Sequence, residues 1–363
     1  MIDLQLFFDF DGTLDRPRVI KVIDVDATSK QFSPKHIGVL KERAGDWSFI
    51  EIDDAVISVF TAGQNIVDDV LYLNPASKTA QRWFRSGETQ NTLLVTEQCD
   101  QLCVMCSQPP KKTHVDYFDH FLVACLLADD HELVGLSGGE PTLHKKALFD
   151  LIFAVIKERP SFQFHVLTNG QHFEPADAAA LTALRNNVIW GVPIYSADPV
   201  KHDEIVGKKG AFDRLQQSLL ILGETGASVE LRTVILKQNQ AQIADLAKWV
   251  SSRMPDVSCW AIMQLEKQGY ALGRWNEQFY DHSTDFRPIG GPVSFALARG
   301  VNVVLYNFPR CTVPSTYRHL CPSTISDWKR HFDDRCGSCP EIKLCSGLFA
   351  WHDEIPYENW GYS

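Results

Sequence analysis

The sequence has no long apolar run. No segment reaches the about 18 apolar residues that a membrane-spanning helix requires. The first residues, Met1 to Asp11, carry no basic stretch, and acidic residues interrupt their short apolar run, which excludes a secretory signal. We therefore expect a cytoplasmic protein that does not enter a membrane.

An excess of basic residues is absent as well. The 45 acidic residues outnumber the 35 basic ones and give a formal net charge of −10, which argues against nucleic acid as the main partner. Internal repeats and low-complexity tracts are also lacking. With 363 residues, of which 45% are apolar, the chain is long enough for two or three domains with real cores, and disorder is excluded.

Cysteine is too scarce for a disulfide scaffold. Ten cysteines in 363 residues fall well below the roughly 8–10% of small disulfide-rich domains. Cytosolic thiols stay reduced, so clustered cysteines are expected to bind metal or to act in catalysis. The positions of the cysteines therefore carry the functional information.

The middle of the chain alternates short apolar runs with helical patterns. This alternation is typical of βα units around a parallel sheet. Six units without a seventh and eighth predict an α/β fold with an open, partial (β/α)6 TIM-like barrel. The expected strands are Thr92–Glu97, Glu132–Ser137, Gln163–Thr168, Val188–Ile194, Ser228–Leu236 and Ser258–Gln264.

Two different regions flank this partial barrel, which we place at residues 91–275. Residues 1–90 show short strand-like runs between polar turns, which predicts a small β-rich N-terminal domain and a candidate for peptide recognition. Residues 276–363 are irregular and rich in Pro, Gly and Cys, and predict a Cys-rich C-terminal extension held together by metal.

One string in the N-terminal region has a competing interpretation. Residues Asp9 to Thr13 (DFDGT) match the motif with which haloacid-dehalogenase-type phosphatases hold Mg²⁺ and an aspartyl nucleophile. Those enzymes need a doubly wound sheet and further motifs downstream, whereas this region is predicted to be β-rich. We interpret the string as a hairpin turn.

The strongest pattern is the C-x3-C-x2-C spacing of Cys99, Cys103 and Cys106. It begins just after the first strand of the βα series, where active sites of parallel βα barrels lie. Three thiolates on one loop can hold three irons of a 4Fe-4S cubane and leave the fourth iron open to a ligand. A zinc site with a fourth ligand is the alternative, although zinc sites favour paired C-x2-C knuckles.

Together with the segment LSGGEPTL at Leu136–Leu143, this spacing resembles the radical S-adenosylmethionine (SAM) superfamily. In that family the free iron chelates SAM, and an electron from the cluster splits the sulfonium to give a 5′-deoxyadenosyl radical. The resemblance implies SAM and a 4Fe-4S cluster on the three cysteines, although Met105 stands where the family has an aromatic residue. It also implies that three residues form the site for the SAM amino group, with Pro141 fixing the turn: Gly138, Gly139 and Glu140.

Later strands end in further candidates for SAM binding. Asn169 follows the third strand and Ser196 the fourth, at positions frequent near SAM in this superfamily, although turn formation is the competing interpretation. Arg232 and Lys208 are candidate partners of the SAM carboxylate, with an ordinary surface charge as the alternative. No residue stands out as a catalytic acid or base.

Five cysteines lie in the C-terminal extension. Cys336, Cys339 and Cys345 form a C-x2-C-x5-C knuckle that resembles part of the SPASM or twitch extensions of radical SAM enzymes. This resemblance implies a second, auxiliary 4Fe-4S cluster. Cys311 is the expected fourth ligand and Cys321 its competitor, and a zinc knuckle is the alternative.

Three further strings narrow the resemblance. The segments NTLLVTEQC (Asn91–Cys99), CSQPPK (Cys106–Lys111) and SDWK (Ser326–Lys329) are similar to the radical SAM maturases of His-Xaa-Ser peptide systems. This implies a ribosomally made precursor peptide whose side chain is crosslinked or oxidised. It also implies a second maturase or accessory protein and an electron donor such as flavodoxin or ferredoxin. The alternatives are radical chemistry on a small molecule and a non-catalytic iron-sulfur or zinc module.

Overall fold

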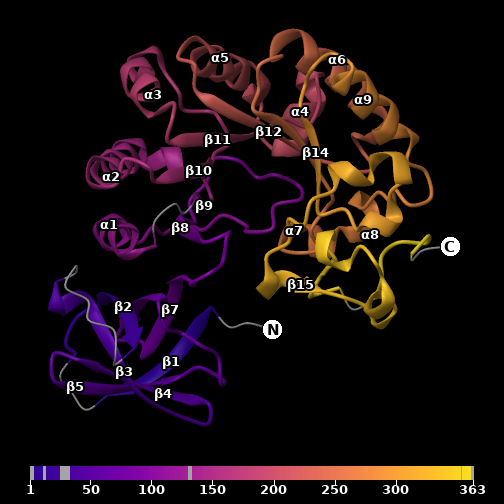
Figure 1. The fold of residues 1–363 in the computed structure, drawn as a ribbon. Coiled ribbons are helices and arrows are strands. Elements are labelled where there is room, and N and C mark those ends of the chain that lie inside the picture. Colours follow the sequence, from indigo (N-terminus) through magenta and orange to yellow (C-terminus); the bar gives the residue numbers. More distant parts are fainter. Residues whose placement is uncertain (1–3, 11–13, 25–32, 130–132, 353, 361–363) are drawn as a thin grey trace.

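The computed structural model describes residues 4–10, 14–24, 33–129, 133–352 and 354–360. Figure 1 shows a small β-barrel as one lobe, a curved sheet with an outer layer of helices as the second, and an irregular C-terminal tail beside that sheet. No helix in these ranges is long and apolar enough to cross a bilayer.

The first seven strands close into a small barrel. Their order is β1-β5-β4-β3-β2-β6-β7, with β7 pairing back to β1. Apolar side chains such as Ile20, Ile50 and Val59 are fully buried in its core. The expectation of a β-rich N-terminal region is confirmed. The strands are β1 Gln5–Phe10, β2 Arg18–Asp24, β3 Ile37–Ala44, β4 Trp47–Ile52, β5 Ala55–Phe60, β6 Val70–Asn74 and β7 Thr79–Phe84.

The DFDGT string begins in barrel strand β1. Residues 11–13 lie outside the described residues. Strand β1 pairs antiparallel with β5 and β7, so β1 and β2 are not neighbours. The turn predicted at this string therefore falls outside the described residues, and the described strands on either side of it do not pair as a hairpin would require. The antiparallel barrel also differs from the doubly wound sheet in which the phosphatase motif acts.

The second sheet is parallel and follows chain order from β8 to β14. Helices cover its outer face (Figure 1), and residues such as Val166, Trp190 and Leu231 are fully buried in its core. The sheet is open, as the partial TIM-like barrel predicts. Its strands are β8 Thr92–Thr96, β9 Leu133–Gly138, β10 Gln163–Leu167, β11 Val188–Pro193, β12 Ser228–Val234, β13 Cys259–Met263 and β14 Val303–Tyr306. The helices are α1 Phe118–Leu127, α2 Lys145–Glu158, α3 Ala178–Leu184, α4 Pro199–Val206, α5 Ala211–Glu224, α6 Ile243–Arg253 and α9 Arg287–Leu297.

The sheet has one more strand than expected. Strand β14 pairs in parallel with β13 although it lies beyond residue 275, in the segment predicted to belong to the extension. The short helices α7 Tyr270–Gly273 and α8 Trp275–Gln278 interrupt the βα alternation before it. Helix α9 carries Pro292 in its interior, which further hides the helical pattern. The count of six strands is therefore corrected to seven.

The N-terminal barrel, the parallel sheet and the tail meet at one junction. Tyr72 and Trp83 of the barrel stack at 4.5 Å between ring centroids, and Phe121 of α1 packs on Trp83. Arg85 donates two hydrogen bonds, of 2.6 and 2.7 Å, to the carboxylate of Asp327 in the tail. The described part of the tail contributes a two-stranded sheet, of β15 Arg330–His331 and β16 Leu348–Phe349.

Candidate active site

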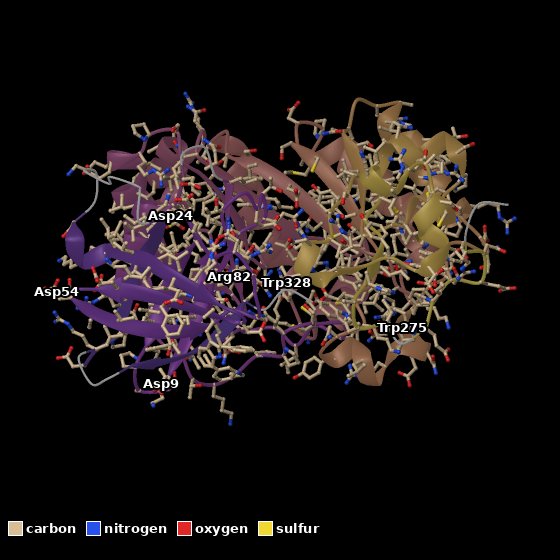
Figure 2. The ribbon with its side chains drawn as sticks, turned by 60° about the horizontal axis from the view of Figure 1, so that its bottom comes forward. Asp9, Asp24, Asp54, Arg82, Trp275 and Trp328 are labelled. Carbon is tan, nitrogen blue, oxygen red and sulfur yellow. The ribbon has the colours of Figure 1, made fainter. Side chains whose placement is uncertain are left out.

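A cavity of about 850 Å³ opens at the carboxyl ends of strands β8 to β13, where active sites of parallel βα barrels lie. It continues to the junction of the N-terminal barrel and the tail, and Figure 2 shows Trp328 of the tail and Arg82 of the barrel in that region. The residues predicted from the sequence that line it are Cys99, Cys103, Cys106, Gly138, Gly139, Asn169 and Arg232. Four other predicted residues are not part of the lining: Glu140, Pro141, Ser196 and Lys208.

The cysteine loop after β8 is held in shape by the end of α4. The N–H groups of Leu102 and Val104 donate to the carbonyls of Val206 and Ile205, at 3.0 and 2.9 Å. Gly207, with φ of +65°, ends the helix, and a side chain there would meet the Leu102 carbonyl oxygen at 2.6 Å. The protein's own backbone contacts therefore shape this loop.

The two glycines after β9 allow the start of the cysteine loop to pack closely. Gly138 has φ of +139°, and a Cβ there would lie 2.0 Å from the carbonyl oxygen of Thr96. A Cβ at Gly139 would lie 2.1 Å from the carbonyl oxygen of Gln98. The Gly139 N–H donates to Thr96 at 2.7 Å. Chain packing alone thus requires both glycines.

Glu140 is completely buried and connects two turns. Its carboxylate accepts hydrogen bonds from the N–H and hydroxyl of Thr142, from the hydroxyl of Thr168 and from the N–H of Asn169. Burial raises the pKa of Glu140, and these donors oppose the rise. All four donors belong to the protein. The carboxylate therefore braces the turn after β9 against the turn after β10.

Asp100, between the first two cysteines, is the next anchor of the loop. It accepts a 2.7 Å hydrogen bond from the Asn169 amide and pairs with His172 at 3.2 Å and with Lys208. Burial would raise the pKa of Asp100, but these donors outweigh it and hold the pKa well below its usual range. Lys208, a candidate for the SAM carboxylate, is thus engaged by Asp100.

Arg232 lies on β12, lines the cavity and contacts the buried carboxylate of Glu230. Glu230 accepts hydrogen bonds from Arg232 and Tyr306, and His165 lies 3.3 Å away. Burial would raise the pKa of Glu230, but His165 and the Arg232 charge outweigh it and lower the pKa to about 2. The Cys259 thiol lies 3.7 Å from Glu230, so Cys259 belongs to this polar cluster.

Ser196 serves the turn after β11. It is buried, donates to Gln242 at 2.9 Å and accepts the N–H of Asp198 at 3.0 Å. The neighbouring Tyr195 lines the cavity instead. Met105 also lines it and packs in the same apolar cluster as Tyr195, so an apolar side chain does occupy the place of the family's aromatic residue.

The three thiols of the loop fit a cluster site. Burial raises the pKa of Cys99 to about 11 and that of Cys103 to about 12, so metal binding must release their protons. Among the described residues, no three His, Cys, Asp or Glu side chains converge as the ligands of a single ion do. In a cubane each thiolate binds a different iron, so its ligands surround a wider space.

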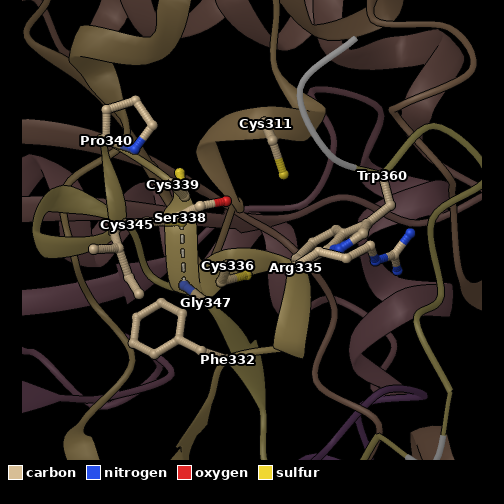
Figure 3. Close-up of a pocket in the computed structure, with 11 residues that line it drawn as sticks. Cys311, Phe332, Arg335, Cys336, Ser338, Cys339, Pro340, Cys345, Gly347 and Trp360 are labelled. Carbon is tan, nitrogen blue, oxygen red and sulfur yellow. Dashed lines mark hydrogen bonds between the residues drawn. The ribbon is translucent and has the colours of Figure 1, made fainter.

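A second cavity of about 510 Å³ lies in the tail (Figure 3). It is lined by the four cysteines expected at the auxiliary site: Cys311, Cys336, Cys339 and Cys345. The N–H groups of Arg310 and Gly347 both point to the Cys345 sulfur at 3.4 Å, which suits a thiolate ligand. Cys321 is fully buried outside this lining, and its thiol lies 3.7 Å from the Tyr317 carbonyl.

Comparison with known families agrees with this geometry. Residues 93–250 match the model of the radical SAM superfamily. This segment is a radical SAM domain. The match covers the cysteine loop, the glycine turn and Arg232, and the superfamily implies a 4Fe-4S cluster and SAM as cofactors.

Individual relatives of the radical SAM domain are more distant. The subtilosin biosynthesis protein AlbA of Bacillus subtilis is 26% identical over 165 residues, which are 44% of this chain and 36% of AlbA. SuiB of Streptococcus suis bound to SAM superposes with a TM-score of 0.49 at 17% identity, over 61% of this chain and 51% of SuiB. The structure of anSMEcpe with bound AdoMet gives 0.47 and 13%, over 58% and 62% of the two chains.

The sequence motifs do not reveal the part of the large cavity that is lined by the N-terminal barrel and the tail. Trp83 of the barrel and Trp328, Lys329 and Trp351 of the tail line it there. Lys329 lies 5.0 Å from the Trp328 ring and 3.8 Å from the half-buried Glu266. Only the SDWK string marked this region, because these residues meet through the packing of separate parts of the chain.

Proposed function

We propose that the protein is a radical SAM enzyme that modifies a side chain of a ribosomally made precursor peptide by crosslinking or oxidation. The observation that carries this proposal is the meeting of Cys99, Cys103, Cys106, the glycine turn and Arg232 around one cavity. A reduced cluster on the three thiolates would supply the electron that cleaves SAM to a 5′-deoxyadenosyl radical.

The protein's own residues bind and orient SAM. The backbone of Gly138 and Gly139 presents polar groups to the amino group, and the Arg232 guanidinium pairs with the carboxylate. Glu230 accepts a hydrogen bond from Arg232 and so fixes the position of the guanidinium. Glu140 and Ser196 keep the turns around the site in position without touching SAM.

The peptide substrate is supported by the sequence resemblance and by the size of the cavity. The related AlbA is named for the biosynthesis of a bacteriocin, subtilosin. The cavity extends beyond the cysteine loop to the N-terminal barrel and the tail, which gives room for an extended chain. A small-molecule substrate is the second candidate, since most ligand pockets fall in the same range of roughly 300–1,000 Å³.

An auxiliary 4Fe-4S cluster on Cys311, Cys336, Cys339 and Cys345 is part of the proposal. These four cysteines would saturate such a cluster and leave no open iron for the peptide, so the group would supply electron-transfer chemistry. We propose residues 1–90 for peptide recognition and residues 276–363, apart from β14, for the auxiliary site. Flavodoxin or ferredoxin, a second maturase or an accessory protein, and a cytoplasmic location complete the proposal.

The test begins with SAM cleavage. The chain is reconstituted anaerobically with iron and sulfide and reduced, and 5′-deoxyadenosine is measured after addition of SAM. We expect product from the wild type and none from Cys103→Ala. Cys125→Ala is the matched control, because this cysteine is fully buried in α1 away from both cavities. An active Cys103→Ala variant would sink the assignment.

The substrate class is tested separately. The chain is coexpressed with short peptides encoded beside its gene, and their masses are compared with and without active enzyme. Loss of hydrogen from one peptide, dependent on Cys103, supports a peptide-modifying enzyme. Vigorous SAM cleavage with every such peptide unchanged would favour the small-molecule alternative.

A further inference from the structure

A buried chain of hydrogen bonds connects the two cavities. Gln264, just after β13, lines the large cavity, and Cys311 lines the cavity in the tail. Between them lies His282, which is completely buried. One ring nitrogen of His282 lies 2.6 Å from the Gln264 amide, and the other lies 2.7 Å from the hydroxyl of Thr312, the residue after Cys311.

The direction of each bond follows from its neighbours. The Pro309 carbonyl can only accept, so the Thr312 hydroxyl donates to it at 2.7 Å and accepts from His282 Nε2. Nδ1 of His282 then accepts from Gln264, whose carbonyl oxygen already accepts the Leu265 N–H at 2.8 Å. A single neutral tautomer therefore satisfies every partner. Burial lowers the pKa of His282 to about 3, in keeping with a neutral ring.

Aromatic side chains fix the imidazole ring on its other sides. The rings of Phe308 and Tyr357 lie 4.5 and 5.1 Å from it, centroid to centroid, at angles of 61° and 67°. Both are buried. With its two nitrogens bonded and its faces packed, His282 has little freedom to move, so the Thr312 hydroxyl is held at a set place.

We propose that His282 is a positioning residue for the auxiliary site. It holds the turn Arg310–Thr312 so that the Cys311 thiolate faces the knuckle cysteines, and it ties this turn to Gln264 in the wall of the SAM cavity. Cys311 needs such support because it lies outside the compact knuckle of Cys336 to Cys345. The proposal rests on the auxiliary cluster proposed above.

The experiment isolates the auxiliary site. A background with Cys99, Cys103 and Cys106 all changed to Ala retains only the auxiliary ligands, so bound iron and its spectrum report that site alone. Iron release to a chelator is then timed in this background. We expect His282→Leu and Thr312→Val to speed release about 10–100-fold, because loss of a supporting hydrogen bond lowers metal affinity by about that factor at other sites.

Three further variants separate positioning from general destabilisation. The double variant is expected to release iron no faster than the worse single variant, since both changes break one chain of bonds. His282→Gln, which can still donate and accept, is expected to restore part of the retention. His202→Leu is the control, because this buried histidine bonds to the Tyr195 N–H, away from the tail. Its release rate and spectrum are expected to match the background.

Failure of this proposal is distinguishable from failure of the proposed function. If the background protein binds no iron, the auxiliary cluster itself is wrong and this proposal falls with it, whereas SAM cleavage by the unaltered chain is unaffected. If the background holds a cluster and both His282→Leu and Thr312→Val release iron at the background rate with the same spectrum, His282 has no positioning role. Thr312→Val nearly preserves side-chain shape, so it provides the test even where His282→Leu fails to fold.

Discussion

Replacing Glu140 by Gln tests whether this residue braces the site or binds SAM. The Glu140 carboxylate has four donors, all from the protein. A glutamine carbonyl oxygen can keep the Thr142 and Thr168 donors. Its NH₂ group then faces the N–H of Asn169, so that one bond is lost and two donors meet in a fully buried place.

The size of the effect follows from these two losses. A hydrogen bond to a charged acceptor contributes about 1.5–3 kcal/mol, and a buried unpaired donor costs about 1–3 kcal/mol. We therefore expect Glu140→Gln to lower the free energy of unfolding by roughly 3–5 kcal/mol. Asn169 would also hold Asp100 less firmly, which loosens the cysteine loop.

The assay is urea unfolding of the metal-free chain, with 5′-deoxyadenosine formation measured over a range of SAM concentrations. Glu224→Gln is the control, because Glu224 is exposed at the end of α5 and such surface changes stay within about 0.5 kcal/mol. The reasoning is refuted if Glu140→Gln unfolds like the control but has a raised KM for SAM. That result would place the carboxylate on the SAM amino group.

Three further outcomes are expected. Gly138→Ala should abolish SAM cleavage and lower the melting temperature, because its Cβ would lie 2.0 Å from the Thr96 carbonyl oxygen; normal activity would contradict this packing. Because folding lowers the pKa of Glu230 to about 2, its ionised carboxylate stabilises the fold at pH values above the ordinary glutamate pKa near 4.5. This contribution is lost as the pH falls toward 2. Unfolding between pH 5 and 2 should therefore be less pH-dependent in Glu230→Gln by roughly 3 kcal/mol, and equal slopes would refute it. A double-mutant cycle on Arg85→Ala and Asp327→Asn, followed by urea unfolding, should give a coupling of about 1–2 kcal/mol, whereas additivity would show that the pair contributes nothing.

The cysteine loop and the glycine turn could be predicted because neighbouring parallel strands end at one edge of a sheet. Cys99 follows β8 and Gly138 ends β9, so adjacent strands had to bring them together. The role of Glu140 could not be predicted in this way. Two of the groups that donate hydrogen bonds to Glu140 belong to Thr168 and Asn169. Only the packing of the two turns shows that these donors occupy the carboxylate.

Other features of the structure depend on contacts between residues that are far apart in the sequence. The apolar run at Val301–Tyr306 favours a strand, but it follows an irregular segment, so its place in the parallel sheet as β14 could not be predicted. Strands β3 and β7 are hard to predict because they carry charged residues such as Glu42, which is exposed, and Arg82, which pairs with the buried Asp69. Cys311 and Cys321 both precede the knuckle, and only the path of the chain after β14 distinguishes them.

The closure of the N-terminal barrel limits how this part of the chain can recognise a partner. Many peptide-binding domains add the peptide as an extra strand on an exposed sheet edge. With β7 paired back to β1, the ring of seven strands leaves no such edge. A peptide recognised by residues 1–90, as proposed, must therefore bind to side chains that point outward from the barrel. Phe7 is exposed beside its partner Phe60, and Trp47 packs on that ring, so an aromatic face is already present for this purpose.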